Sequence, residues 1–196
     1  MKKNLAFCSL LLCIICSMYG CKNNTANKPL EKTGDTIRLF YPVIDYFKEQ
    51  IENVDNTSPF IYKITIKNGR KDSVALNKQQ FNQWAQAFIE YDINDKSLHK
   101  LYTENIFLDE TTNSYTFNYT AKDSSLPLQS LTVLLDAGDQ HVKRVFITKV
   151  KSYGDTLVTE KGGWKNDKNF YINSITEAPG NVTTTQQNII VWNNQP

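Results

Sequence analysis

The chain has 196 residues, of which 40% are hydrophobic, with 22 basic and 20 acidic side chains and a formal net charge of +2. Lys2 and Lys3 lie in a segment that has no acidic residue, so residues 21–196 carry 20 charges of each sign. This balance argues against proteins that need clustered positive charge, such as nucleic-acid-binding and polybasic membrane-surface proteins. The remaining length, about 175 residues, suits one folded domain.

The N-terminal segment has the layout of a secretory signal peptide. Lys2 and Lys3 provide a positive start, an apolar run extends from Leu5 to Met18, and the small residue Gly20 follows. A transmembrane helix needs about 20 apolar residues, and this run is shorter. We therefore expect residues 1–20 to be a cleaved leader that does not span a membrane.

The four cysteines all lie at positions 8 to 21. Only Cys21 follows a small residue, Gly20, and signal peptidases require a small side chain immediately before the cut. The stretch Met18-Tyr19-Gly20-Cys21 resembles the lipobox of bacterial lipoprotein precursors, although Leu and Ala or Ser usually stand where Met18 and Tyr19 do. The resemblance implies that Cys21 becomes the acylated N-terminal residue and anchors the protein to a membrane through lipid.

The same resemblance implies a location in the bacterial cell envelope. Lys22 follows Cys21 where some lipoproteins carry the aspartate that retains them at the inner membrane, and this favours the outer membrane. Two other interpretations stay open: the cysteines are small apolar residues of a leader, or Cys21 pairs with another molecule. With no other cysteine, the mature domain cannot use disulfides, thiolate catalysis or cysteine-ligated metal.

A polar stretch separates the cysteine from the domain. Residues 22–36 read KNNTANKPLEKTGDT, without an aromatic residue and with Pro29 and Gly34. This composition predicts a flexible tether over residues 21–36. A single globular domain is expected over residues 37–196.

Two amphipathic helices are predicted early in the domain. Apolar residues at helical spacing favour a helix that begins at Pro42, a residue type tolerated in the first turn, and ends near Asn53. Asn77 and Gln80 resemble a capping box. The stripe that follows predicts a second helix that ends around Tyr91 to Asn94. We expect its aromatic side chains to pack on a sheet, with a ligand pocket that includes Trp84 as the alternative.

A β-hairpin around Asn68-Gly69 is predicted between the helices. A two-residue turn would place Ile64 opposite Ser73 and mismatch the apolar positions of the two strands, whereas a three-residue loop pairs Ile64 with Val74. Because a one-residue slip turns every side chain to the other face, we expect the three-residue loop.

The rest of the chain predicts an antiparallel meander. Gly154-Asp155 suits a type II′ turn that sets Lys149 opposite Glu160. The last strand is apolar on both faces and is expected to take a sheltered place in the sheet. The expected fold is α+β, with two N-terminal helices packed on a curved, mainly antiparallel β-meander sheet. Strands are predicted at residues 102–108, 114–121, 129–135, 142–153, 156–160, 170–176 and 188–192.

Few residues suggest chemistry. His99 and His141 lack metal-ligand spacing, and neither a metal nor another cofactor is expected. Gly162-Gly163-Trp164 is interpreted as a loop, whose Trp164 either grips a sugar or a peptide or folds back onto the sheet edge, and we favour the second interpretation.

Three Asp-Ser/Thr-apolar triplets resemble sites at which some envelope bacteria O-glycosylate exported proteins. Their acceptors are Thr36, Ser73 and Thr156.

Three function classes follow from these patterns. The first is a lipid-anchored envelope protein whose domain is a non-enzymatic binding or scaffolding module for an unknown protein or apolar small molecule. The second is a carrier or sensor of an apolar ligand held in a cavity between the sheet and the helices, by analogy with lipoprotein-carrier folds. The third and least favoured is a hydrolase that uses carboxylates. No nucleic-acid partner is expected.

Overall fold

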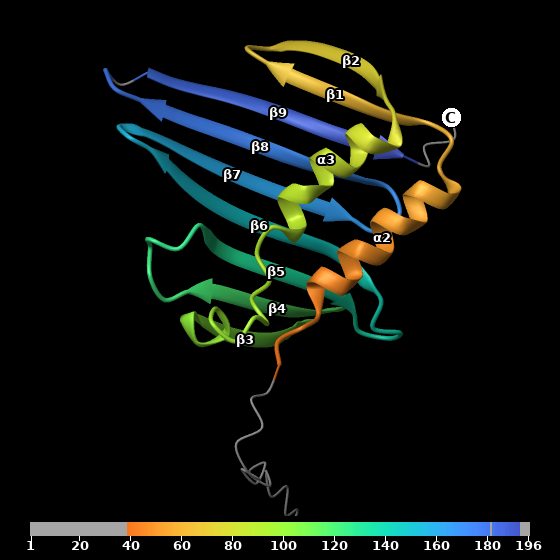
Figure 1. Cartoon of the computed structure of the whole chain (residues 1–196). Helices are drawn as coiled ribbons and strands as arrows, with labels where there is room; N and C mark the ends of the chain where they lie inside the picture. The colour runs from red at the N-terminus through yellow and green to blue at the C-terminus, as the bar shows by residue number, and fades with distance from the viewer. Residues whose placement is uncertain (1–38, 181, 193–196) are drawn as a thin grey trace, which may run out of the picture. The chain divides into compact units, whose positions relative to one another are not determined.

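Two α-helices and a nine-stranded antiparallel sheet form the part of the chain that the computed structural model describes, residues 39–180 and 182–192. The fold class is therefore α+β with a large sheet, and all described residues fall in one compact unit (Figure 1). The expected signal peptide (1–20), the lipidation site Cys21, the tether (21–36) and Thr36 lie outside the described residues.

The two helices begin where the sequence predicts. Helix α2 (Val43–Thr57) starts directly after Pro42 and runs four residues past the predicted end. Helix α3 (Lys78–Ile89) is capped by Asn77, whose Oδ1 accepts the Gln80 N–H at 2.8 Å while the Asn77 N–H donates to Gln80 Oε1 at 2.9 Å. The predicted capping box is thus confirmed. Among the described residues, neither these helices nor the short 3-10 turn η2 (His99–Leu101) is long and apolar enough to cross a bilayer.

The sheet consists of a meander joined to an N-terminal hairpin. Strands β3 to β9 pair in chain order, and β9 pairs on its other side with β1, giving the order β2-β1-β9-β8-β7-β6-β5-β4-β3. The strands are β1 (Ile61–Lys67), β2 (Arg70–Leu76), β3 (Tyr102–Asp109), β4 (Ser114–Ala121), β5 (Leu128–Asp136), β6 (Val142–Tyr153), β7 (Thr156–Lys165), β8 (Asn169–Ala178) and β9 (Val182–Trp192).

This topology corrects one part of the expected fold. The helices do not form an N-terminal block before the sheet, because β1 and β2 lie between α2 and α3 in the chain. The expected return of the last strand is confirmed, since β9 lies between β1 and β8 and is hydrogen-bonded to both. Its apolar residues on both faces fit this interior position.

The β1–β2 hairpin has a two-residue turn and not the predicted three-residue loop. Ile64 lies opposite Ser73, and Lys67 opposite Arg70, so the turn contains two residues. Asn68 and Gly69 both have positive φ, 50° and 73°, as a type I′ turn requires. Strand β2 is exposed along almost its whole length, so it buries no apolar face that would have to match an apolar face of β1. Turn geometry therefore decided the register.

The β6–β7 hairpin follows the prediction. Tyr153 lies opposite Thr156, and Gly154 has φ 60° while Asp155 has no positive φ, which fits a type II′ turn. Lys149 lies opposite Glu160, and their side chains form an ion pair with Nζ 3.0 Å from Oε2.

An aromatic core fills the space between the helices and one face of the sheet. Trp164 on β7 stacks on Phe170 of β8 at 4.7 Å between ring centroids. Phe47 of α2 and Phe88 of α3 each lie 5.2 Å from the Trp164 ring. Both helices cover this side of the sheet in Figure 1, which we call the covered face. Such ring pairs add about 0.5–1.5 kcal/mol each beyond the burial of their area.

Candidate binding face

The Gly162-Gly163-Trp164 motif lies inside strand β7 and not in a loop. The strand continues to Lys165, with β6 on one side and β8 on the other. Trp164 is 1% exposed and belongs to the aromatic core. Both expectations for this residue, an exposed loop and the sheet edge, are therefore wrong. The motif instead marks a point where large side chains approach the strand from both sides.

The two glycines make room on opposite faces of the sheet. A Cβ on Gly162 would lie 2.8 Å from Ile147 Cγ1 and 3.0 Å from the Phe88 ring, so Gly162 admits α3 to the covered face. A Cβ on Gly163 would lie 2.5 Å from Cε1 and 2.7 Å from the hydroxyl of Tyr171. The outer half of the Tyr171 ring therefore rests on bare backbone, on the side away from the helices.

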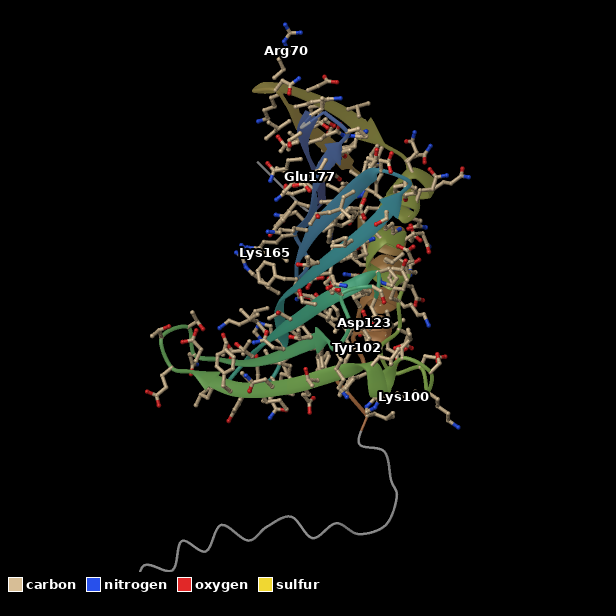
Figure 2. The ribbon with its side chains drawn as sticks, turned by 90° about the vertical axis from the view of Figure 1, so that its left-hand side faces the viewer. Arg70, Lys100, Tyr102, Asp123, Lys165 and Glu177 are labelled. Atoms are coloured by element: carbon tan, nitrogen blue, oxygen red, sulfur yellow. The ribbon has the colours of Figure 1, made fainter. Side chains whose placement is uncertain are left out.

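Tyr171 belongs to a row of residues across the side of the sheet that faces away from α2 and α3. Phe146 on β6 and Tyr171 on β8 both lie opposite Gly163 on β7, so the two aromatic side chains stand on either side of the glycine. The row continues to Ile189 on β9 and Ile64 on β1. These four side chains are half-buried. They form an apolar strip that no described helix covers (Figure 2).

Basic side chains flank this strip. Lys161 and Lys165 lie two residues before and two residues after Gly163, so alternation places them on the same face of the sheet. Arg144 lies opposite Lys165, and Figure 2 shows Lys165 pointing away from the helices. We call these three cations together with Phe146 and Tyr171 the open face.

The open face is electrostatically unbalanced. Among the described residues, no ion pair joins Arg144, Lys161 or Lys165 to a carboxylate. Glu177 is the one acidic residue at the outward positions of β6–β9, and it lies six residues from Tyr171 along β8, about 20 Å in extended chain. Three neighbouring cations without acidic partners favour an anion at this surface.

On the covered face, in contrast, a buried lysine is paired with carboxylates. Lys149 is 2% exposed, and its Nζ lies 3.2 Å from Glu90 Oε2 and 3.0 Å from Glu160 Oε2. Lys151 reaches Glu90 Oε1 at 2.9 Å. Desolvation raises the pKa of the Glu90 carboxyl, but the hydrogen bond from Lys151 and the charge of Lys149 outweigh it, and the pKa is lowered. The cluster is therefore a satisfied ionic network at the end of α3.

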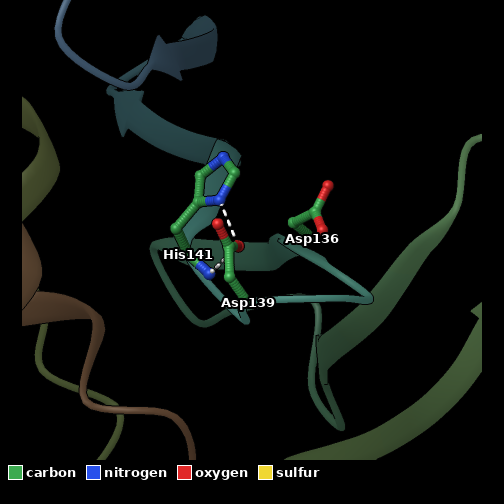
Figure 3. A group of neighbouring side chains, drawn as sticks. All are labelled: Asp136, Asp139 and His141. Atoms are coloured by element: carbon green, nitrogen blue, oxygen red, sulfur yellow. Dashed lines mark hydrogen bonds and ion pairs between the residues drawn. The ribbon is translucent and has the colours of Figure 1, made fainter.

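A group of three potential metal ligands lies in the β5–β6 turn. Asp136, Asp139 and His141 bring ligand atoms within 4.8 Å of one another (Figure 3). Both carboxylate oxygens of Asp136 already have partners, the Gly138 N–H at 2.8 Å and Lys143 Nζ at 3.2 Å. Asp139 accepts the His141 N–H and contacts its ring. These contacts lower the pKa of both aspartates and explain the group as a turn motif.

A polar groove of about 420 Å³ lies between α2 and the β7–β8 turn, with Glu49, Glu52 and Asp167 in its lining. Glu49 and Glu52 are exposed on the helix. Asp167 holds the turn, since its N–H donates to Gln50 Oε1 at 3.0 Å and its carboxylate accepts from Asn53 and Asn166. The groove has a structural explanation in these contacts.

The space between the helices and the sheet is nearly filled. The cavity lined by Val43, Phe88, Leu131 and Lys149 has a volume of about 10 Å³, room for no more than one water. This is far below the several hundred cubic ångströms that a small apolar ligand requires.

The other residues singled out from the sequence are scattered. Trp84 lies half-buried on α3, with Lys63 Nζ 5.0 Å from its ring centroid, and is separate from the open face. Ser73 is exposed on the edge strand β2, and Thr156 is half-buried after the β6–β7 turn. Their O-glycosylation stays a prediction, as does a ligand contact at Trp84.

Sequence reasoning missed the residues of the open face. Arg144 and Phe146 lie at alternate positions of a strand that was predicted with correct bounds, so the sequence was enough to predict that they share a face of the sheet. Lys161 and Lys165 could not be placed on that face, because the predicted strand ended at Glu160. Comparison with protein-family models, curated proteins and solved structures gave no significant match.

Proposed function

We propose that the protein is a lipid-anchored cell-envelope protein at the outer membrane, that its domain is a non-enzymatic binding module, and that the open face is its binding surface. The observation that carries this proposal is the half-buried pair Phe146 and Tyr171, surrounded by three cations that have no carboxylate partner among the described residues. Aromatic residues and arginine are the types enriched at the energetic centres of interfaces. The anchor rests on the sequence pattern at Cys21.

The two rival functions have less support. The filled space beneath the helices argues against a carrier of an apolar ligand, because burial of such a ligand needs a preformed cavity. The carboxylates at the polar groove are exposed or already hold a turn, which gives a hydrolase no convergent acid and base there. A binding module needs neither feature.

Lysine labelling in native envelopes tests the binding surface. An amine-reactive reagent is applied to intact envelopes and to the purified full-length protein, and mass spectrometry measures modification at each lysine. If the open face is occupied in the envelope, Lys161 and Lys165 lose reactivity there and recover it after purification. Lys48, exposed on α2, provides the matched control and keeps equal reactivity in both samples. Equal labelling of Lys161 in both samples contradicts the proposal.

A second experiment tests the anchor. Replacement of Cys21 by Ser removes the thiol that the lipobox resemblance assigns to acylation. The expected result is release of the protein from the membrane fraction and loss of the mass of the acyl chains. A Cys16→Ser variant is the matched control and stays membrane-bound. Membrane retention of the Cys21→Ser variant without a change in mass would sink the anchor interpretation.

A further inference from the structure

The open face lies in the middle of the sheet, and this position limits what can bind there. Strands β6, β7 and β8 each pair on both sides, so their backbone N–H and C=O groups are used in the ladder. Peptides that add to a sheet as a strand need an edge with free backbone groups. A ligand of the open face must therefore be recognised by side chains alone.

The Tyr171 ring is held as a platform. One side of its outer half rests on the Gly163 backbone, and the residue is half-buried. Phe146 stands across the same glycine. A ring placed in this way offers a flat apolar surface of the kind that stacks on another flat or puckered ring bearing C–H groups.

The cations around the platform are spaced for a repeating anion. Lys161 and Lys165 lie on either side of Gly163, about 13 Å apart along the extended strand, with Arg144 beside Lys165. A chain of rings with a negative charge on each repeat could meet both lysines while one ring lies on Tyr171. An acyl chain carries no charge that could pair with Lys161, Lys165 or Arg144.

We infer that the open face binds an anionic polysaccharide, with a sugar ring stacked on Tyr171 and its carboxylate or phosphate groups paired with Lys161, Lys165 and Arg144. The inference rests on the proposed function, of which it names the ligand class. Its components are charge complementarity, the glycine-backed ring and the absence of free backbone groups in the central strands.

Binding is measured by calorimetry on the full-length protein in a neutral detergent. The probes are polygalacturonate as a carboxylated polysaccharide, phosphomannan as a phosphorylated one, dextran as an uncharged one and polyglutamate as an acidic peptide. At least one of the two anionic polysaccharides is expected to bind, with an affinity that falls as salt rises, while dextran does not bind. Vesicles with and without phosphatidylglycerol test an anionic lipid surface as the rival ligand.

Variants separate the parts of the site. The double change Lys161→Gln and Lys165→Gln is expected to weaken polysaccharide binding about tenfold or more, and Tyr171→Leu by a similar factor. Lys48→Gln, on the far side of the domain, is the charge-matched control and changes affinity by less than about twofold. Thermal unfolding of each variant shows that the domain remains folded.

Four results overturn the inference: neither anionic polysaccharide binds, dextran binds as tightly, polyglutamate or anionic vesicles bind equally well, or Tyr171→Leu leaves the affinity unchanged. The lysine labelling described above tells this failure from failure of the proposed function. Protection of Lys161 in envelopes without polysaccharide binding refutes only the ligand class. Absence of protection refutes the binding face itself.

Discussion

The two faces of strands β6–β8 carry the same residue types, aromatic side chains and lysines, but bury and pair them differently. On the covered face, Trp164 and Phe170 are at most 1% exposed, and Lys149 lies between two carboxylates. On the open face, Phe146 and Tyr171 are only half-buried, and Lys161 has no acidic partner among the described residues. Two helices cover one face and no described helix covers the other, so identical chemistry stabilises the domain on one side and stays available for binding on the other.

Strand β9 joins the β1–β2 hairpin to the meander, and its removal is expected to unfold the covered face. Deleting residues 187–196 takes away Ile190 and Trp192, which are buried, and separates the β1–β2 hairpin from β8. We expect loss of cooperative unfolding in circular dichroism. Deleting only residues 193–196 leaves β9 whole and is the matched control. A cooperative transition in the longer deletion would show that the covered face does not depend on β9.

A pair of aromatic truncations measures the two faces directly. Trp164→Ala removes the centre of the buried cluster and is expected to lower the free energy of unfolding by about 3–5 kcal/mol. Phe146→Ala, on the neighbouring strand and the other face, removes a half-buried ring and is expected to cost about 1–2 kcal/mol. Urea denaturation gives both values. Equal losses would mean that the open face is as much a core as the covered one.

The ionic cluster on the covered face predicts a smaller, pH-dependent effect. Glu90→Gln removes a carboxylate whose folded-state pKa is lowered, chiefly by Lys151 and Lys149 against the desolvation that raises it. A lowered pKa stabilises the fold above the unfolded pKa, near about 4.3, and this stabilisation disappears as the pH falls through the folded pKa. Because Glu90 is exposed in part, the loss at pH 7 is of the order of 1 kcal/mol or less.

Thermal unfolding of Glu90→Gln at a series of pH values checks this sign. The difference from the unmodified protein is expected at pH 7 and should vanish toward pH 3. Glu177→Gln, on the same side of the sheet as the open face but outside it, is the matched control, because Glu177 forms no ion pair among the described residues. A difference that grows as the pH falls would contradict the assignment of Glu90.

Periodicity in the sequence was enough for most elements of the fold. The helix starts at Val43 and Lys78 and the full bounds of β4 and β6 follow from spacing, capping and turn residues. The predicted hairpin register was wrong because β2 is exposed, so that its apolar residues did not report a buried face. The predicted end of β7 was wrong because two adjacent glycines favour a loop locally, and only the packed neighbours Phe88 and Tyr171 explain them in a strand.

The candidate site could not be predicted from local sequence patterns either. A row that crosses β6, β7 and β8 joins residues from three hairpin arms, and its members meet only once each register is known. The sequence indicated tryptophans as contacts, whereas the structure leaves Tyr171 and Phe146 half-buried and buries Trp164 completely. Burial on one face or the other depends on which side the helices cover, and local patterns do not contain that information.

The adjacent glycines of β7 allow the most direct test of the division between the faces. Gly162→Ala pushes into Ile147 and Phe88 in the core and is expected to lower the free energy of unfolding by about 1–3 kcal/mol, with Lys161 still protected in envelopes. Gly163→Ala displaces the free end of the Tyr171 side chain and is expected to cost less, while protection of Lys161 is lost. The measurement is lysine labelling in envelopes for both variants, together with their unfolding free energies. If Gly163→Ala destabilises as strongly as Gly162→Ala and leaves Lys161 protected, Tyr171 is a core residue that takes no part in binding, and the division between the two faces is wrong.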